Sequence, residues 1–316
     1  MTQTLMNALF PIFFGLLLGY VAGLRKLVDN VNVRSLATFV MRFALPCALF
    51  ITVARTPVEQ LSEQANGIVT ILISYVAIYF VTYLIERRIY KAAPAPSAVQ
   101  ALTLGFPNLS AVGIPLLEAL FGPRAGASVA MAIAVGAVTV SPVTLAILEG
   151  TTEAGAAKSS FNRVYHCVMQ AVRHPVVLAP IFGLLAAFLH WNIPTFLERS
   201  FRTMGLVTAG GALFLTGLII SAQTVRMNWH VISAVIITNI LQPALALGLA
   251  YALKLPADQT RVVVLLNALP SGFFGMVFGT GFKVTPEVTS SVLLVSHAFS
   301  VVSLAGWIVF LNSNSY

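Results

Sequence analysis

Long apolar stretches, each separated from the next by a few polar residues, follow one another along the whole chain. Ten of them are long enough to cross a bilayer, which takes on the order of 20 residues of helix. They cover approximately residues 5–24, 33–54, 66–86, 97–120, 125–148, 174–190, 204–221, 230–253, 259–280 and 287–311. No polar stretch between them is long enough for a soluble domain. The pattern predicts an all-α polytopic membrane protein of about ten transmembrane helices.

Composition supports the same class. Hydrophobic residues make up 58% of the chain and charged residues only 9%, and the mean hydropathy is +0.90, far from the values of soluble domains. The first apolar stretch follows no basic residue and precedes no small-residue cleavage site, so we expect a retained helix and not a removed signal peptide. The two cysteines, Cys47 and Cys167, are too few and too far apart for a disulfide framework or a metal site, and we expect them to pack.

Lys and Arg are distributed unequally between the loops of the two sides, and Arg42 lies inside the second span. Cytoplasmic loops carry the excess, so both termini are expected on the outer, periplasmic side of the cell inner membrane. The net charge of +8 follows from this asymmetry and gives no reason to expect a nucleic-acid partner. The richer set of loops holds Arg25, Lys26, Arg34, Arg87, Arg88, Lys91, Lys158, Arg163, Arg173, Arg226 and Lys283, and the poorer set Arg55, Arg124, Arg199, Arg202, Lys254 and Arg261.

The chain also shows traces of an internal repeat. "PIFFGLL" from Pro11 matches "PIFGLL" from Pro180, "CALFIT" from Cys47 matches "GALFLT" from Gly211, and Pro107 corresponds to Pro270. We therefore predict a five-helix repeat at 1–148, a cytoplasmic linker at 149–173 and a second repeat at 174–316. Because five is odd, the second copy enters the membrane from the opposite side, which is the inverted repeat of secondary transporters.

The fourth and ninth spans contain helix breakers at equivalent places, in "LTLGFPNLSAVGIPLL" (102–117) and "NALPSGFFG" (267–275). A proline removes one backbone donor, and an unsatisfied polar group in lipid costs several kcal/mol. Either the prolines only kink packed helices, or the helices are broken and line a site. In a broken pair, Asn108 or Ser110 would cap the second half-helix, and the two N-terminal ends would converge and favour an anion.

At these residues the sequence resembles the auxin efflux carrier family. The segments "RFALPCALF" from Arg42 and "VRHPVVLAPIFGLL" from Val172 also resemble that family, although His174 stands where Asn is commoner in it. The resemblance implies ten helices in two inverted repeats, helices 4 and 9 that cross at proline breaks, a scaffold of helices 1, 2, 6 and 7, and a homodimer. It also implies a secondary carrier, and the short linker is similar to that of bacterial members associated with malonate or related carboxylates. Pro107, Pro270 and Asn108 match the family's break residues, and Ser271 replaces its second polar residue. The candidate substrate-binding residues are Arg42, Pro107, Asn108, Ser110, Gly113, Asn267, Pro270 and Ser271.

Four further polar residues lie within spans. Arg42 could pair with a carboxylate substrate or extend to the interface. His297, central in the last span, could carry a proton or be hydrogen-bonded packing. Asn239 and Gln242 could line the cavity or join helices, and the joining role is favoured.

The sequence lacks the motifs of the main membrane enzymes. It has no pair of carboxylates at mid-membrane, no G-x-S-x-G, no H-E-x-x-H and no Gly-rich phosphate loop. We therefore expect no enzymatic activity, no cofactor and no metal site. The predicted function is secondary active transport of a small organic anion by alternating access, coupled to a proton or sodium. The alternatives are an exporter of auxin-like or amino-acid-like weak acids, an anion channel, and an anion-binding membrane sensor.

Overall fold

The computed structural model describes residues 2–30, 33–58, 64–122, 125–151, 165, 169, 173, 175–222, 226–284 and 286–313. Within these residues every regular element is a helix, as the apolar pattern predicts. Most of the predicted linker 149–173, including Cys167, lies outside the described residues, and so does His174.

Seven helices in the described part of the chain are long and apolar enough to cross a membrane. They are Arg34–Ala54, Ala65–Arg88, Pro94–Phe121, Ala125–Gly150, Thr195–Ser221, Trp229–Ala252 and Glu287–Ser313. The shorter apolar helices Phe10–Leu24 and Pro175–Phe188 coincide with the first and sixth predicted spans. The polytopic class is thus confirmed, whereas the total of ten crossings, the inverted repeats and the sidedness stay predictions.

One helix extends well beyond its predicted membrane span. The seventh span was expected to begin at residue 204, but α13 (Thr195–Ser221) begins nine residues earlier. The first turns of α13 carry charged side chains. The side chain of Arg202 donates a 3.0 Å hydrogen bond to that of Glu198, which lies one helical turn earlier. A helix continues through polar residues because its backbone bonds do not depend on apolar side chains, so a hydropathy pattern alone places the start too late.

The chain divides into two compact units, each with segments from both predicted repeats. Unit 1 consists of Met1–Asn66, Leu109–Ala134 and His174–Gln223. It includes the first, second, sixth and seventh predicted spans, which are the scaffold helices that the family resemblance implies. Unit 2 consists of Gly67–Asn108, Val135–Arg173 and Thr224–Tyr316.

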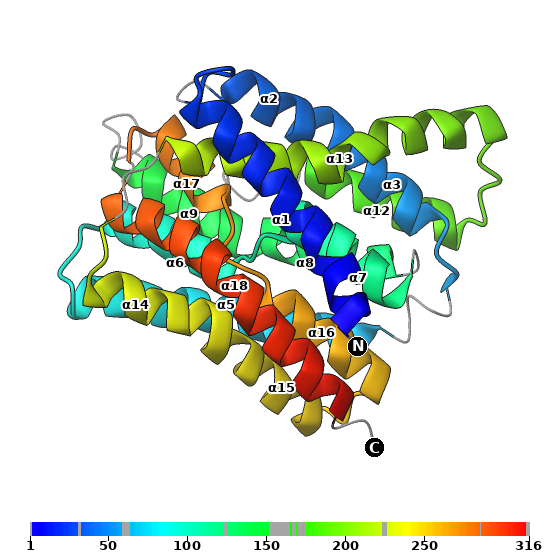
Figure 1. The fold of residues 1–316 in the computed structure, drawn as a ribbon. Helices are drawn as coiled ribbons and strands as arrows, with labels where there is room; N and C mark the ends of the chain where they lie inside the picture. The colour runs from blue at the N-terminus through cyan, green and yellow to red at the C-terminus, as the bar shows by residue number, and fades with distance from the viewer. Residues whose placement is uncertain are drawn as a thin grey trace. The chain divides into compact units, whose positions relative to one another are not determined.

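In unit 1, α1 (Thr2–Leu24) runs alongside α13, and α12 (Pro175–Phe188) packs on α3 (Leu45–Ala54) (Figure 1). Glycines bring α1 and α13 together. A Cβ on Gly19 would lie 2.0 Å from the carbonyl oxygen of Phe214, and one on Gly217 would lie 2.0 Å from that of Leu16. Small residues allow this close approach of backbones in membrane proteins.

The remaining elements of unit 1 are α2 (Arg34–Phe39), η1 (Val40–Ala44), η2 (Leu109–Gly113), α7 (Ile114–Phe121) and the part of α8 (Ala125–Val138) up to Ala134. Of these, α7 packs on α1 and η2 packs on α13.

Unit 2 is built from α5 (Ala65–Arg88), α6 (Pro94–Gly105), α9 (Val140–Gly150), α14 (Trp229–Ile236), η3 (Ile237–Leu241), α15 (Gln242–Ala252), α16 (Ala257–Ala268), α17 (Phe274–Gly281) and α18 (Glu287–Ser313). Its core joins Ile78 of α5, Leu104 of α6, Val231 of α14 and Val292 of α18. The helix α6 also packs on α9 and α17, so it lies at the centre of the unit.

Three π-helical turns, η1, η2 and η3, occur where prolines follow, at Pro46, Pro115 and Pro243. A proline clashes with the carbonyl four residues before it, and a π-turn takes up one extra residue. The N–H of Leu45 donates to Val40 O and that of Gln242 donates to Ile237 O, both five residues back. These prolines are therefore absorbed within continuous helices.

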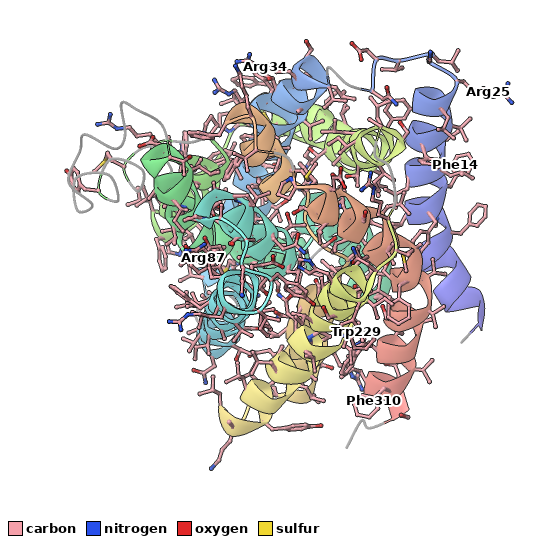
Figure 2. All side chains as sticks on the ribbon, turned by 90° about the vertical axis from the view of Figure 1, so that its left-hand side faces the viewer. Phe14, Arg25, Arg34, Arg87, Trp229 and Phe310 are labelled. Carbon is pink, nitrogen blue, oxygen red and sulfur yellow. The ribbon has the colours of Figure 1, made fainter. Side chains whose placement is uncertain are left out.

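Large apolar side chains project outward from the helices, as Figure 2 shows for Phe14 and Phe310, which are 50% and 42% exposed. Trp229, the first residue of α14, is 73% exposed. Such exposure is expected of a chain whose surroundings are lipid, with aromatic residues enriched near the interfaces.

Candidate functional site

The two predicted helix breaks lie side by side within unit 2. The first, Phe106–Asn108, follows α6, and the second, Leu269–Phe273, separates α16 from α17. The N–H of Asn108 donates to the carbonyl of Pro270 at 2.9 Å. The N–H of Gly272 donates to the carbonyl of Thr103, also at 2.9 Å. We refer to these two segments as the paired breaks.

The pairing supplies the backbone partners that Pro107 takes away. In a continuous helix the carbonyl of Thr103 would accept from residue 107, which as a proline has no N–H; Gly272 fills that place. The next carbonyl, Leu104 O, accepts instead from the Thr238 hydroxyl of η3 at 3.3 Å. The broken helix is thus satisfied by the second break and by η3, as the bilayer requires.

Glycines make this contact possible. A Cβ on Gly272 would lie 1.9 Å from the carbonyl oxygen of Phe106, and one on Gly275 would lie 2.1 Å from the Thr103 hydroxyl. Both distances are far below van der Waals contact, so only glycine fits. The ring of Phe106 is fully buried and stacks on Phe274 with a centroid distance of 4.9 Å.

Two consecutive residues of α18 bind the two breaks. The N–H of Ser271 donates to the Ser296 hydroxyl at 2.9 Å, and the Asn108 side-chain amide lies 3.0 Å from Nε2 of His297. The ring is held from its other side, because Nδ1 lies 2.6 Å from the carbonyl oxygen of Leu293. All of these groups are buried except for a few per cent of the surface.

Asn239, in the π-turn η3, holds α18 in place. Its Oδ1 accepts from the Ser296 hydroxyl at 2.7 Å, and its Nδ2 donates to the Ser303 hydroxyl at 3.3 Å. Its backbone carbonyl accepts from the indole N–H of Trp307 at 3.1 Å. These bonds give Asn239 the helix-joining role that the sequence favoured.

Asn267 and Gln242 also join helices. Oδ1 of Asn267 accepts from the Ser74 hydroxyl at 2.8 Å and from Nε2 of Gln242 at 3.3 Å. Its Nδ2 donates to the carbonyl of Val263 at 2.9 Å. The side chain of Asn267 is therefore engaged within the protein, three residues before Pro270.

The hydroxyl of Ser271 differs from its neighbours, because it is fully buried and has no hydrogen-bond partner among the described residues. An unsatisfied buried hydroxyl costs about 1–3 kcal/mol, so such groups usually have a reason to be there. Ser271 stands three residues before α17, at the positive end of that helix dipole. A polar ligand at the second break would give this hydroxyl its partner.

The remaining predicted residues belong to unit 1. Ser110 is fully buried within η2, and its hydroxyl has no partner among the described residues, so Ser110 is not the residue that caps the second half-helix. The π-turn at 109–113 supplies the reason, since its backbone continues directly into α7. Gly113 is buried at the end of the same turn, and Arg42 is exposed in η1. Both stay predictions as substrate-binding residues.

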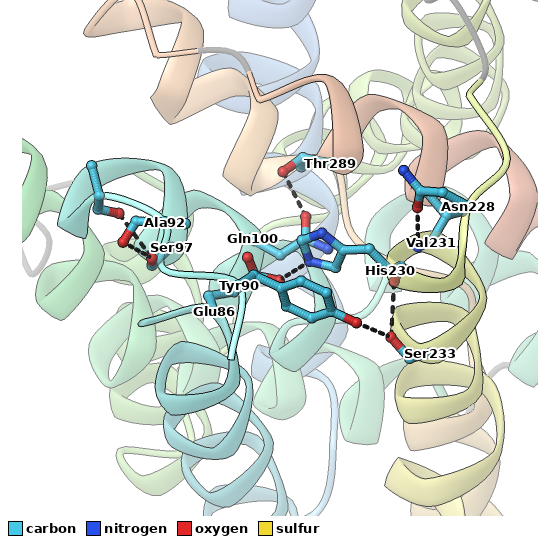
Figure 3. A network of polar contacts seen from close by, with 11 residues as sticks. Glu86, Tyr90, Ala92, Ser97, Gln100, Asn228, His230, Val231, Ser233 and Thr289 are labelled. Atoms are coloured by element: carbon cyan, nitrogen blue, oxygen red, sulfur yellow. Dashed lines mark hydrogen bonds and ion pairs between the residues drawn. The ribbon is translucent and has the colours of Figure 1, made fainter. Parts of the chain in front are cut away.

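A second polar network of unit 2 joins the end of α5 to the start of α14 (Figure 3). Oε1 of Glu86 lies 2.5 Å from Nε2 of His230, and the ring of Tyr90 stacks on the imidazole with centroids 3.4 Å apart. The hydroxyl of Tyr90 lies 3.2 Å from that of Ser233. Asn228 caps α14 by accepting from the N–H of Val231 at 2.9 Å.

Sequence reasoning missed Ser296 and the Glu86–His230 pair. Ser296 is one of many serines in the last span, and nothing in its local pattern separates it from the others; only its adjacency to His297 was a signal. Glu86 looked like an ordinary residue at the end of a span, yet it is only 5% exposed. In the part of the chain that the structure describes, no group of three or more His, Cys, Asp or Glu side chains is arranged to hold a metal ion.

Comparison with known proteins identifies the family of the chain. A family model described as membrane transport protein matches residues 4–308. The "Uncharacterized transporter YfdV" of Escherichia coli K12 is 27% identical over 303 residues, which cover 95% of each chain. The "Putative malonate transporter" of Rhizobium meliloti is 25% identical over 311 residues, or 96% of this chain and 95% of that one. The "Auxin efflux carrier component 8" of Arabidopsis thaliana is 29% identical over 125 residues, or 37% and 34% of the two chains. The chain therefore belongs to the membrane transport protein family, the auxin efflux carrier type of transporter that its sequence resembles.

Proposed function

We propose that the protein is a secondary carrier of a small organic anion, with malonate or a related carboxylate as substrate, and that it works by alternating access. The carboxylate binds at the paired breaks, beside Asn108 and Ser271. The observation that carries this proposal is the fully buried hydroxyl of Ser271, just before α17, which has no hydrogen-bond partner among the described residues.

Three features of the paired breaks support the binding of an anion there. The positive end of the α17 dipole lies at the second break, and the Ser271 hydroxyl is a donor with no acceptor in the described part of the chain. The Asn108 amide approaches His297 of α18, the residue after Ser296, whose hydroxyl binds the Ser271 N–H. No carboxylate occurs in either break, so nothing there repels a negative charge. Partial charges of this kind bind a carboxylate without holding it irreversibly.

The choice of substrate rests on similarity alone. One relative is named as a malonate transporter and another as an auxin efflux carrier, and both names denote carriers of carboxylates. An exporter of auxin-like or amino-acid-like weak acids uses the same site chemistry. The substrate panel of the experiment below separates these possibilities.

The test is counterflow of labelled malonate into proteoliposomes preloaded with unlabelled malonate, with other organic anions as competitors. We expect trans-stimulated uptake by the native protein and a loss of roughly tenfold or more in Ser271→Ala and in Asn108→Ala, since a hydrogen bond to a charged group contributes about 1.5–3 kcal/mol. Because the Ser271 hydroxyl has no partner among the residues that the structure describes, we expect its removal to leave thermal stability unchanged.

Ser300→Ala is the matched control, because the hydroxyl of Ser300 donates to the carbonyl of His297 in its own helix, at 2.7 Å. This variant keeps counterflow. Full activity of Ser271→Ala and Asn108→Ala would rule out the proposed site. Binding of anions without any exchange would point to the sensor, and conduction without counterflow to a channel.

A further inference from the structure

The helix α16 ends at the second break without the donors that would normally follow it. In a continuous helix the carbonyls of residues 266–268 would accept from the N–H groups of residues 270–272. Pro270 has no N–H, and the N–H groups of Ser271 and Gly272 donate elsewhere. Among the described residues no other donor reaches these three carbonyls. The buried oxygens left without a partner are those of Leu266, Asn267 and Ala268.

The end of α6 at the first break is different, although that helix also stops at a proline. Its carbonyls at 102–104 accept in turn from the N–H of Phe106, the N–H of Gly272 and the Thr238 hydroxyl. Donors therefore cover the negative end of the α6 dipole, whereas that of α16 has none in the described part of the chain. A buried helix C-terminus of the second kind favours a cation.

A fourth oxygen at the same place belongs to Gln242, and the amide of Asn267 fixes its orientation. Nδ2 of Asn267 donates to the carbonyl of Val263 at 2.9 Å, so its other atom, Oδ1, faces Gln242. That oxygen can only accept, so Gln242 turns Nε2 toward it, at 3.3 Å. Oε1 of Gln242 is left on the opposite branch of the amide. It is fully buried and has no partner among the described residues.

These four oxygens have the chemistry of a site for a cation of single charge. Backbone carbonyls at a broken helix are known ligands of Na⁺ in transporters. Ca²⁺ and Mg²⁺ are instead bound through carboxylates, and neither α15 nor the last ten residues of α16 contain Asp or Glu. The oxygens are neutral amide and carbonyl groups, so they can bind a monovalent ion without binding it irreversibly.

We propose that the end of α16 and Oε1 of Gln242 bind a monovalent alkali cation such as sodium, and that this ion is transported together with the anion. This inference rests on the proposed function and names its coupling ion. The cation lies at the negative end of α16 and the anion at the positive end of α17, so the second break holds both. Each charge offsets the cost of burying the other.

The binding test uses the full-length protein in detergent, without any organic anion. Sodium chloride is compared with choline chloride at equal concentration. A ligand that binds only the folded state raises the melting temperature, so we expect sodium to raise it by a few degrees and choline to leave it unchanged. Potassium chloride is the third salt, and stabilisation by potassium in place of sodium also supports an alkali-cation site.

Gln242→Met removes the oxygen and should abolish the stabilisation by sodium. This substitution also removes a donor to Oδ1 of Asn267, so Ser74→Ala is the matched control. It removes the other donor to that atom, at 2.8 Å, and leaves Oε1 of Gln242 in place. Ser74→Ala should keep the response to sodium. Gln242→Glu retains an oxygen and adds a negative charge, so it should bind sodium at least as tightly as the native protein does.

The transport test uses proteoliposomes whose membrane potential is clamped at zero. An inwardly directed sodium gradient of about tenfold should accumulate labelled malonate about tenfold over protein-free vesicles if one ion accompanies each anion. A sodium ionophore should abolish this accumulation. Gln242→Met should lose it at low sodium concentration, and Ser74→Ala should keep it.

Native protein that exchanges malonate, but that neither sodium nor potassium stabilises or drives, would overturn the inference and leave the proposed function intact. A native response to sodium in Gln242→Met, or its loss in Gln242→Glu, would also overturn it. Stabilisation by sodium without any counterflow in the native protein would reject the proposed function instead, and would retain the cation site alone.

Discussion

Two histidines of unit 2 have opposite surroundings. His230 pairs with the carboxylate of Glu86 and stacks on Tyr90 near the ends of two helices. His297 is held by an amide and a backbone carbonyl in the middle of α18. The first arrangement ties α5 to α14 through two side chains, whereas the second ties α18 to the first of the paired breaks.

The regions around these two histidines also differ in the kind of contact that stabilises them. The Glu86–His230 region is made by side chains that reach across from α5 to α14. The paired breaks are made by backbone groups that approach so closely that no Cβ fits at Gly272. A substitution that adds atoms between the two backbones should therefore reduce transport and stability more than one that changes a side-chain charge. Substitutions at the paired breaks should likewise reduce transport more than substitutions at Glu86.

The largest effect is expected for Gly272→Ala. Its Cβ would lie 1.9 Å from the carbonyl oxygen of Phe106, and that backbone cannot yield without losing the bond from Gly272 N–H to Thr103. We expect counterflow to disappear and the melting temperature to fall. Gly306→Ala in α18, where no atom lies within 4 Å of the added carbon, is the control. Normal transport by Gly272→Ala would show that the breaks need not stay paired.

Asn108→Asp converts the contact at His297 into the kind found at His230. The new carboxylate would repel an anionic substrate, so counterflow should fall at least about tenfold. Asn228→Asp serves as the control, because aspartate caps a helix as well as asparagine does. Retention of malonate exchange by Asn108→Asp would contradict a carboxylate site beside residue 108.

Ser296→Ala removes the acceptor of the Ser271 N–H and the donor to Asn239 at once. Each buried group left unpaired costs about 1–3 kcal/mol, which thermal unfolding in detergent can measure. The matched change is Ser300→Ala, one turn later, because the hydroxyl of Ser300 donates to a carbonyl of its own helix. Equal stability of the two variants would mean that Ser296 does not hold the second break.

Glu86→Gln gives His230 an amide partner like that of His297, and we expect the smallest effect. The hydrogen bond can persist with a neutral acceptor, and the change should cost about 1 kcal/mol, or a few degrees in melting temperature. Transport should be unchanged in counterflow. A loss of exchange as large as that of Asn108→Asp would remove the distinction drawn between the two histidines.

Prolines within the spans of this chain occur in two different local structures. Pro46, Pro115 and Pro243 follow π-turns in continuous helices, whereas Pro107 and Pro270 lie in open breaks. The local pattern indicated the breaks correctly because Asn108 and Ser271 stand directly beside those prolines. It did not indicate the π-turns, because a shift from four- to five-residue bonding depends on neighbouring helices and leaves no mark on composition.

The sequence alone determined the membrane class, the approximate position of the helices, the places of the two breaks and the family, because hydropathy, proline and glycine act locally or in short motifs. Only the tertiary structure decided that the breaks pair, that Ser296 and His297 bind one break each, and that Asn239 and Asn267 join helices. The physical reason is distance along the chain. Asn108 and His297 are separated by 189 residues, and a buried hydrogen bond between such partners is fixed by the packing of whole helices.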